Sequence, residues 1–161
     1  MAIVAAMAVP HPPIILPEIG RGEEKKIAKT AAAYREVMRR AADLEPDTVV
    51  ITSPHATMYS DYFHISPGKS ARGDFSAFRC PEVEIEAEYD AAFSKALADA
   101  CAEEDLPAGF LGEREPALDH GTMIPLYFLQ PALKKPVKVV RIGLSGLSAD
   151  VHYRLGRLIQ D

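Results

Sequence analysis

The stretch Val49-Val50-Ile51-Thr52-Ser53-Pro54-His55 predicts both the centre of the fold and the place of a site. A continuous apolar, β-branched run that stops at a proline is typical of a strand buried on both faces. A residue before proline favours extended geometry, so we expect the strand to end at Ser53. His55 then lies just beyond the carboxyl end of the strand, which is the edge where open parallel α/β sheets bind ligands.

The N-terminus repeats this arrangement, with an apolar run over residues 2–9, then Pro10 and His11. We expect a strand over 2–9, a proline-fixed loop, an amphipathic helix over 23–44 and a second strand over 48–53. Such a βαβ unit makes a parallel pair with a right-handed crossover. The prediction is an α/β fold with a central, mostly parallel sheet flanked by helices on both faces, and with two imidazoles at one sheet edge.

The remaining pattern predicts alternating strands and helices. Asp119 is expected to cap the helix that Asp119–Thr122 opens. Four glutamates that alternate with apolar residues are expected to face water, the alternative being a carboxylate cluster for a metal. The expected elements are a short strand over 62–66, a loop or flap over 67–81, a strand over 82–88, a helix over 89–104, a short strand over 106–111, a helix over 123–129, a strand over 137–143 and a helix from Ser148 to the end.

Length and composition favour one domain over residues 1–161 and exclude several classes of partner. The chain has a formal net charge of −5 and no dense basic cluster, so nucleic acid is not expected as a partner. No apolar run is long enough for a membrane span, and residues 1–17 favour a buried strand over a signal peptide. Cys80 and Cys101 lack metal spacing, which predicts free thiols in a reducing cytoplasm.

The chain ends at Asp161 on the last expected helix, with no later strand to use that helix as a crossover. We therefore expect a part of a larger domain, or a domain that another chain completes. The exposed face of the final helix predicts self-association into a homo-oligomer.

Three of the five histidines follow or begin expected elements. His11 and His55 can point at one Zn or Fe ion above the sheet edge. A carboxylate as the third ligand would complete the facial triad of non-haem Fe(II) oxygenases. The alternative is that each histidine only hydrogen-bonds a loop. His64 and His152 are expected on the surface.

Three motifs in order carry a family resemblance: Pro10-His11-Pro12-Pro13-Ile14, Ser53-Pro54-His55-Ala56, and Leu118-Asp119-His120-Gly121-Thr122. The chain resembles the class III extradiol ring-cleavage dioxygenases of the LigB type, over nearly its whole length. Within that family it resembles the branch whose members are associated with AMMECR1 domains and radical-SAM proteins. Human Memo is a more distant relative of this branch. The resemblance implies an N-terminal portion of a LigB-like domain.

The resemblance implies roles for three residues. His11 and His55 would bind Fe(II), with Zn as the alternative ion, and His120 would be the catalytic histidine that contacts substrate. The glutamate that completes the metal site and the acid–base histidine are expected beyond Asp161, since His152 does not match that motif. The implied reaction is extradiol cleavage of a catechol by dioxygen in aromatic compound metabolism.

Three hypotheses remain open on the sequence. The first is a metal-dependent dioxygenase-like enzyme. The second is a Memo-like metal- or ligand-binding protein without dioxygenase activity that partners AMMECR1 or radical-SAM proteins. The third is an inert α/β fragment that has lost its site.

Overall fold

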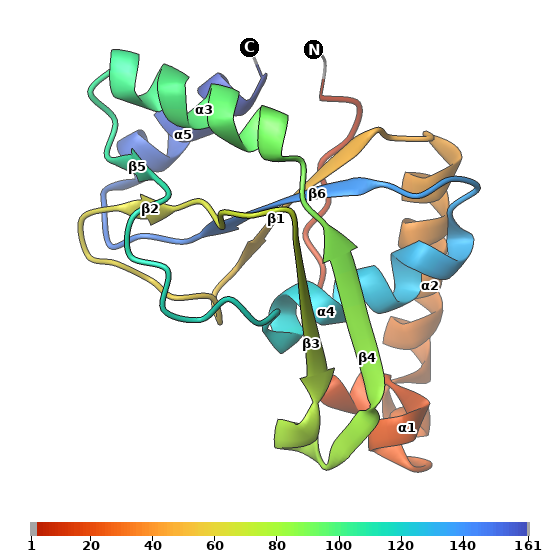
Figure 1. Cartoon of the computed structure of the whole chain (residues 1–161). Coiled ribbons are helices and arrows are strands. Elements are labelled where there is room, and N and C mark those ends of the chain that lie inside the picture. Colours follow the sequence, from red (N-terminus) through yellow and green to blue (C-terminus); the bar gives the residue numbers. More distant parts are fainter. Residues whose placement is uncertain (1–2, 161) are drawn as a thin grey trace.

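The computed structural model describes residues 3–160, and its centre is a parallel pair of strands. β1 (Thr48–Ser53) pairs with β6 (Lys138–Gly143) in register from Thr48 opposite Lys138 to Ser53 opposite Gly143. Both strands are rich in β-branched residues, which suit a pleated surface covered on both sides. The predicted strands over 48–53 and 137–143 are therefore confirmed, at the position shown in Figure 1.

Shorter strands extend this pair. β2 (Phe63–His64) pairs in parallel with β5 (Ala108–Gly109), and an antiparallel bridge between Ile65 and Ile142 joins this pair to β6. β3 (Ser70–Phe75) and β4 (Cys80–Glu88) form an antiparallel hairpin, which a bridge between Tyr89 and Val139 connects to the same edge of β6, nearer its amino end. The predicted short strands over 62–66 and 106–111 exist but are only two residues long.

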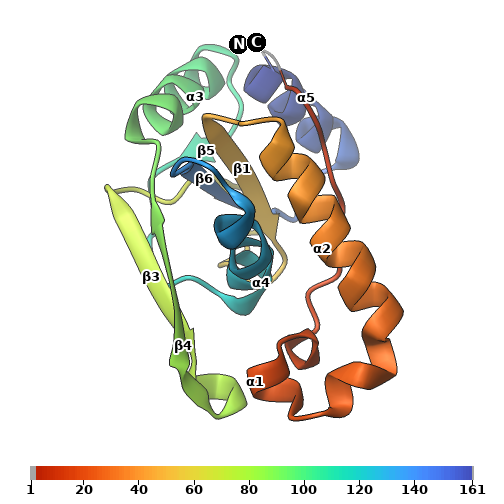
Figure 2. The same cartoon turned by 90° about the vertical axis from the view of Figure 1, so that its right-hand side faces the viewer.

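Helices cover both faces of the central pair, as predicted (Figure 2). Val139 packs in the core cluster that includes α2 (Ala28–Asp43) and α4 (His120–Leu129). Its neighbour Val140 packs in the cluster that includes α3 (Ala91–Glu103) and α5 (Ala149–Gln160). Successive side chains of a strand point to opposite faces, so one strand supplies both cores. The chain is an α/β protein.

The short helical segments lie mainly near the N-terminus. They are η1 (Pro13–Ile15), α1 (Pro17–Gly20), η2 (Glu23–Ile27), η3 (Ser76–Phe78) and η4 (Gln130–Ala132). The predicted helix over 23–44 therefore begins as a 3₁₀ segment and becomes α-helical at Ala28. The helix predicted over 123–129 begins earlier, at His120, because Asp119 caps it.

The prediction of a strand over residues 2–9 is wrong for residues 3–9, and residue 2 lies outside the described residues. This segment has no secondary structure, and Ile3 and Val4 are 52% and 63% exposed. A strand requires a ladder partner, and within residues 3–160 the only strand paired with β1 is β6. The predicted βαβ unit is therefore also wrong, since the parallel partner of β1 comes from the other end of the chain.

The loop predicted over 67–81 is also wrong, because Ser70–Phe75 forms β3. The Gly, Ser and Pro content concealed a strand that pairs with the glutamate-rich β4. The close packing of β3 on the loop before α4 requires glycine at one position, since a Cβ at Gly73 would collide with the carbonyl oxygen of Leu118. The four glutamates of β4 are exposed, as expected.

His64 was predicted on the surface, and this prediction is wrong. It is 5% exposed, and its Nδ1 lies 2.9 Å from the Leu111 carbonyl oxygen. His152 is half-buried, with its ring against Phe63. Cys80 and Cys101 are free and buried, as predicted. No helix among residues 3–160 combines the length and apolar character that crossing a membrane requires.

Candidate functional site

Three histidines from separate segments converge at the carboxyl end of the central strands. The Nε2 atoms of His11 and His55 lie 2.9 Å apart. The ring of His120 lies 3.9 Å from that of His55 and 5.8 Å from that of His11, measured between centroids. Each residue offers one ring nitrogen, and these atoms all lie within 4.8 Å of one another. The structure thus brings together all three histidines that the sequence analysis singled out.

Local chemistry fixes two of these histidines. His55 follows β1, and its backbone N–H donates to Ser53 Oγ at 3.1 Å. His120 is the first residue of α4, and the Asp119 carboxylate caps that helix by accepting from Thr122 N–H. Gly121 lies so close that an added Cβ would collide with Ser53 Oγ and lie 3.2 Å from His55 Cδ2. Glycine at this position therefore allows α4 to approach β1 closely.

Asp119 is the most densely bonded side chain of the site. Its Oδ1 accepts from Ser53 Oγ at 2.5 Å, and its Oδ2 accepts from Thr122 Oγ1 at 2.8 Å and from Arg141 Nη2 at 3.1 Å. Burial disfavours the charged carboxylate, but these hydrogen bonds and the Arg141 charge outweigh it and hold the pKa of Asp119 below its usual range. Asp119 is therefore an anion in the neutral pH range.

His120 is held in its neutral form. Burial lowers the pKa of its imidazole, and the neighbouring His55 lowers it further because two positive charges would repel each other. One face of the group is aromatic, since the Phe78 ring of η3 lies edge-on to His120 at 5.1 Å between centroids.

The donor set fits a metal ion. Neutral imidazole is a common ligand for Zn and Fe, and two Nε2 atoms that face each other can share one proton or one cation. Within residues 3–160 no carboxylate joins the histidine group. Asp119 is occupied by its four hydrogen bonds, and Glu18 accepts from Tyr127 instead. A carboxylate ligand would therefore come from outside the described residues.

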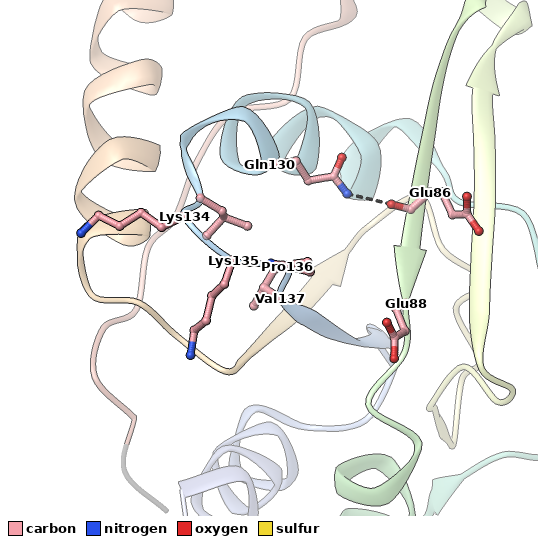
Figure 3. A pocket seen from close by; sticks show the side chains of 8 residues that line it. Glu86, Glu88, Gln130, Lys134, Lys135, Pro136 and Val137 are labelled. Carbon is pink, nitrogen blue, oxygen red and sulfur yellow. Dashed lines mark hydrogen bonds between the residues drawn. The ribbon is translucent and has the colours of Figure 1, made fainter.

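Two cavities differ in their relation to the histidines. An apolar cleft of about 570 Å³ between residues 3–9 and β1 reaches the group, and its lining includes Val9, His11, Gly121 and Pro125. The other cavity, of about 390 Å³, lies at the amino end of β6 between β4 and the loop after α4 (Figure 3). There Gln130 Nε2 donates to the Glu86 carbonyl oxygen. Parallel sheets bind their ligands at the carboxyl ends of the strands, so we expect a ligand in the apolar cleft rather than in the other cavity.

Arg141 and Ser53 are site residues that the sequence analysis missed. Arg141 is 2% exposed in a strand whose other described core positions are apolar. A charged residue inside a run such as Val139–Ile142 indicates a buried partner, because an unpaired buried charge is costly. That partner is Asp119, which the sequence analysis identified only as a helix cap.

Comparisons with known proteins identify the family of the chain. The family model described as "catalytic LigB subunit of aromatic ring-opening dioxygenase" matches residues 5–161. Protein CA_C1420 of Clostridium acetobutylicum is 34% identical over 165 residues, which cover 97% of this chain and 35% of that protein. The chain thus spans about a third of the length of this curated relative.

Proposed function

The chain belongs to the family of the catalytic LigB subunit of aromatic ring-opening dioxygenases, and on that premise we propose that it carries the histidine half of a metal-dependent dioxygenase site. In this proposal His11 and His55 would hold Fe(II), and His120 would contact the substrate. The substrate class is a catechol that is cleaved beside its diol. The proposal assigns neither a third ligand nor an acid–base histidine among the described residues.

The observation that carries the proposal is the facing pair of Nε2 atoms, 2.9 Å apart, with His120 beside them. Structural histidines usually hydrogen-bond a carbonyl or a carboxylate, as His64 does. Here the partner of each imidazole is another imidazole, which suits ligands of one cation. The apolar cleft that reaches His11 supports an aromatic ligand.

The chain's own residues have distinct tasks in this site. A bound iron would supply a template for substrate and dioxygen, together with electron transfer between them. Neutral His120 can accept a proton from a substrate hydroxyl or donate its ring N–H, since burial keeps the imidazole uncharged. Phe78 excludes water from one side of His120 and offers an aromatic edge to a ring. Asp119, bonded to Thr122 N–H, keeps α4 in place.

Metal binding is the first test. The purified chain is stripped with chelator, reconstituted anaerobically with Fe(II) or Zn(II), and analysed for bound metal. We expect close to one ion per chain in the wild type and a large loss in His11→Ala and His55→Ala. His152→Ala is the control, because that histidine lies outside the group. Equal metal content in all four proteins would overturn the proposal and leave an inert α/β domain.

Oxygen uptake with catechols tests the reaction. The relative is about three times as long, so the measurement uses both the 161-residue chain and the product of the complete reading frame. We expect the complete product to take up oxygen with Fe(II), and its His120→Ala variant to lose turnover with metal retained. Metal binding without uptake in the complete product would favour the Memo-like alternative, a metal- or ligand-binding protein that partners AMMECR1 or radical-SAM proteins.

The same proposal includes a cytoplasmic location and self-association. Size-exclusion chromatography with light scattering gives the oligomeric state directly. Co-purification of the complete product with AMMECR1-domain and radical-SAM proteins from the same genome tests the partners. A monomer that captures neither class of protein would remove self-association and these partners from the proposal and leave the metal site untouched.

A further inference from the structure

A buried arginine is linked to the histidine group through Asp119, although it hydrogen-bonds to no imidazole among the described residues. Arg141 is in the middle of β6 and its side chain is 2% exposed, and that of its partner Asp119 is 9% exposed. The Arg141 Nη2 lies 3.1 Å from Asp119 Oδ2, and its Nη1 donates to the Glu115 carbonyl oxygen at 3.2 Å. Burying an ion pair seldom stabilises a fold more than apolar residues would. Its presence in a strand that is otherwise apolar at its buried positions therefore suggests a positional role.

Asp119 connects Arg141 to two of the histidines along separate branches. One branch runs along the chain, because Asp119 directly precedes His120 and caps α4. The other runs through Ser53, whose Oγ donates to Asp119 Oδ1 at 2.5 Å and accepts from the His55 backbone N–H at 3.1 Å. One carboxylate thus holds the start of α4 and the turn after β1 in a fixed relation.

We propose that Arg141 and Ser53 are positioning residues that, through Asp119, set the spacing of His55 and His120 and thereby tune the affinity of the group for a divalent cation. This inference rests on the proposed function. Residues behind metal ligands orient the ligands, and their loss typically weakens metal binding about 10- to 100-fold. Among the described residues His11 reaches this network only through His55, whose Nε2 lies 2.9 Å from that of His11.

Ser53→Ala is the decisive variant, because it removes one hydroxyl and keeps both charges. Ser94→Ala is its matched control, since Ser94 is a buried serine of α3 whose Oγ has no hydrogen-bond partner within residues 3–160. Arg141→Lys keeps the charge but cannot donate through two nitrogens to Asp119 and Glu115 at once. Thermal melting of all variants checks that each is folded.

The first readout is titration with Co²⁺ alone, followed by the visible absorption of the bound ion. We expect Ser53→Ala and Arg141→Lys to weaken Co²⁺ binding about tenfold or more and to alter the absorption spectrum. Ser94→Ala should match the wild type in both. A change in stability alone would not move the spectrum, so affinity and spectra that equal the wild type in both site variants would overturn the proposal.

The second readout does not require metal. Two-dimensional NMR of the histidine ring nitrogens in metal-free protein should show shifted His55 and His120 signals in Ser53→Ala, with the His152 signals unchanged. If the wild type binds no Co²⁺, the proposed function fails while this experiment still tests the network. Unchanged His55 and His120 signals would overturn the positioning role.

Discussion

The three histidines should make the metal-free protein sensitive to mild acid. His55 and His120 have ring centroids 3.9 Å apart. Two unit charges at this distance repel by about 4 kcal/mol at an effective dielectric constant of 20 and by about 1 kcal/mol in bulk water. His55 is exposed and His120 is half-buried, so the repulsion lies between these limits. A positive charge on His120 is therefore disfavoured in the folded state, in addition to the cost of its burial.

The sign of the effect follows from linkage between protonation and folding. The pKa of His120 in the folded protein is below its ordinary value of 6.5, because of burial and the nearby His55. The unfolded chain thus binds more protons than the folded chain, and stability is lost as the pH falls through 6.5. In the limiting case the imidazole stays neutral in the folded chain at pH 5.5, while in the unfolded chain it titrates with a pKa near 6.5. The free energy of unfolding at pH 5.5 is then about 1.4 kcal/mol lower than at high pH, which is the largest effect that one imidazole can have.

Replacing His55 with glutamine should remove the part of this cost that comes from charge repulsion, since His55 is the histidine nearest to His120. The larger part, which comes from the burial of His120, should remain. The assay is urea denaturation in EDTA at pH 8 and pH 5.5, followed by circular dichroism because the chain has no tryptophan. The free energy of unfolding should fall between the two pH values by up to about 0.7 kcal/mol less in His55→Gln than in the wild type, which is half of that limit. His152→Gln is the control and should keep the wild-type dependence.

Comparing two pH values cancels any pH-independent cost of the substitution, such as the lost contact with His11. If His55→Gln and the wild type lose the same free energy between pH 8 and pH 5.5, the imidazoles do not repel each other in the folded protein. The convergence of the three rings in metal-free protein would then be wrong.

Three other predictions concern the scaffold. Asp90 caps α3 and accepts from Thr48, so Asp90→Ala should lower the free energy of unfolding by about 1 kcal/mol. Burial opposes the charge of Asp90, but these hydrogen bonds outweigh it and keep the pKa of Asp90 low. Urea denaturation should therefore show the full loss at pH 7 and a smaller loss as the pH falls through that pKa. Thermal melting should show that Gly73→Ala is destabilised by about 1 to 3 kcal/mol, because its Cβ collides with Leu118. Gly156→Ala, in open space within α5, should instead be stabilised by about 0.5 to 1 kcal/mol. Equal effects of the two substitutions would contradict the packing described. Burial raises the pKa of both cysteine thiols, so a thiol reagent at pH 8 should modify Cys80 and Cys101 only after denaturation, and rapid labelling of the folded chain would count against their burial.

The central strands were predictable because their chemistry is local. Val49–Ser53 and Val139–Ile142 contain the β-branched runs that buried parallel strands require, and proline or glycine ends each run. The partner of β1 was not predictable in the same way. Pairing depends on contacts between distant segments, and the apolar run over 3–9 looked equally suited to the role that β6 fills.

The β3–β4 hairpin shows the opposite case. Residues 70–75 have weak strand propensity, with glycine and three polar or charged side chains, and alone they resemble a loop. Their structure comes from the ladder with β4, whose alternation of apolar and acidic residues the sequence did reveal. A strand of this kind follows from its neighbour's pattern rather than from its own.

The site was predicted through a mistaken element, and the reason explains why the prediction still reached the right residues. His11 was placed by a strand that does not form, yet its ring meets His55. The anchor lies on the other side of His11, where Pro13 begins η1 and the side chains of Ile15 and Leu16 are fully buried in the core cluster beneath α2 and α4. Burial of these two large aliphatic side chains fixes the segment that follows Pro10-His11-Pro12 and so holds His11 near the start of α4. The ladder is therefore not needed to bring His11 to the group, and substitutions in residues 3–9 should disturb the imidazole less than substitution of Leu16.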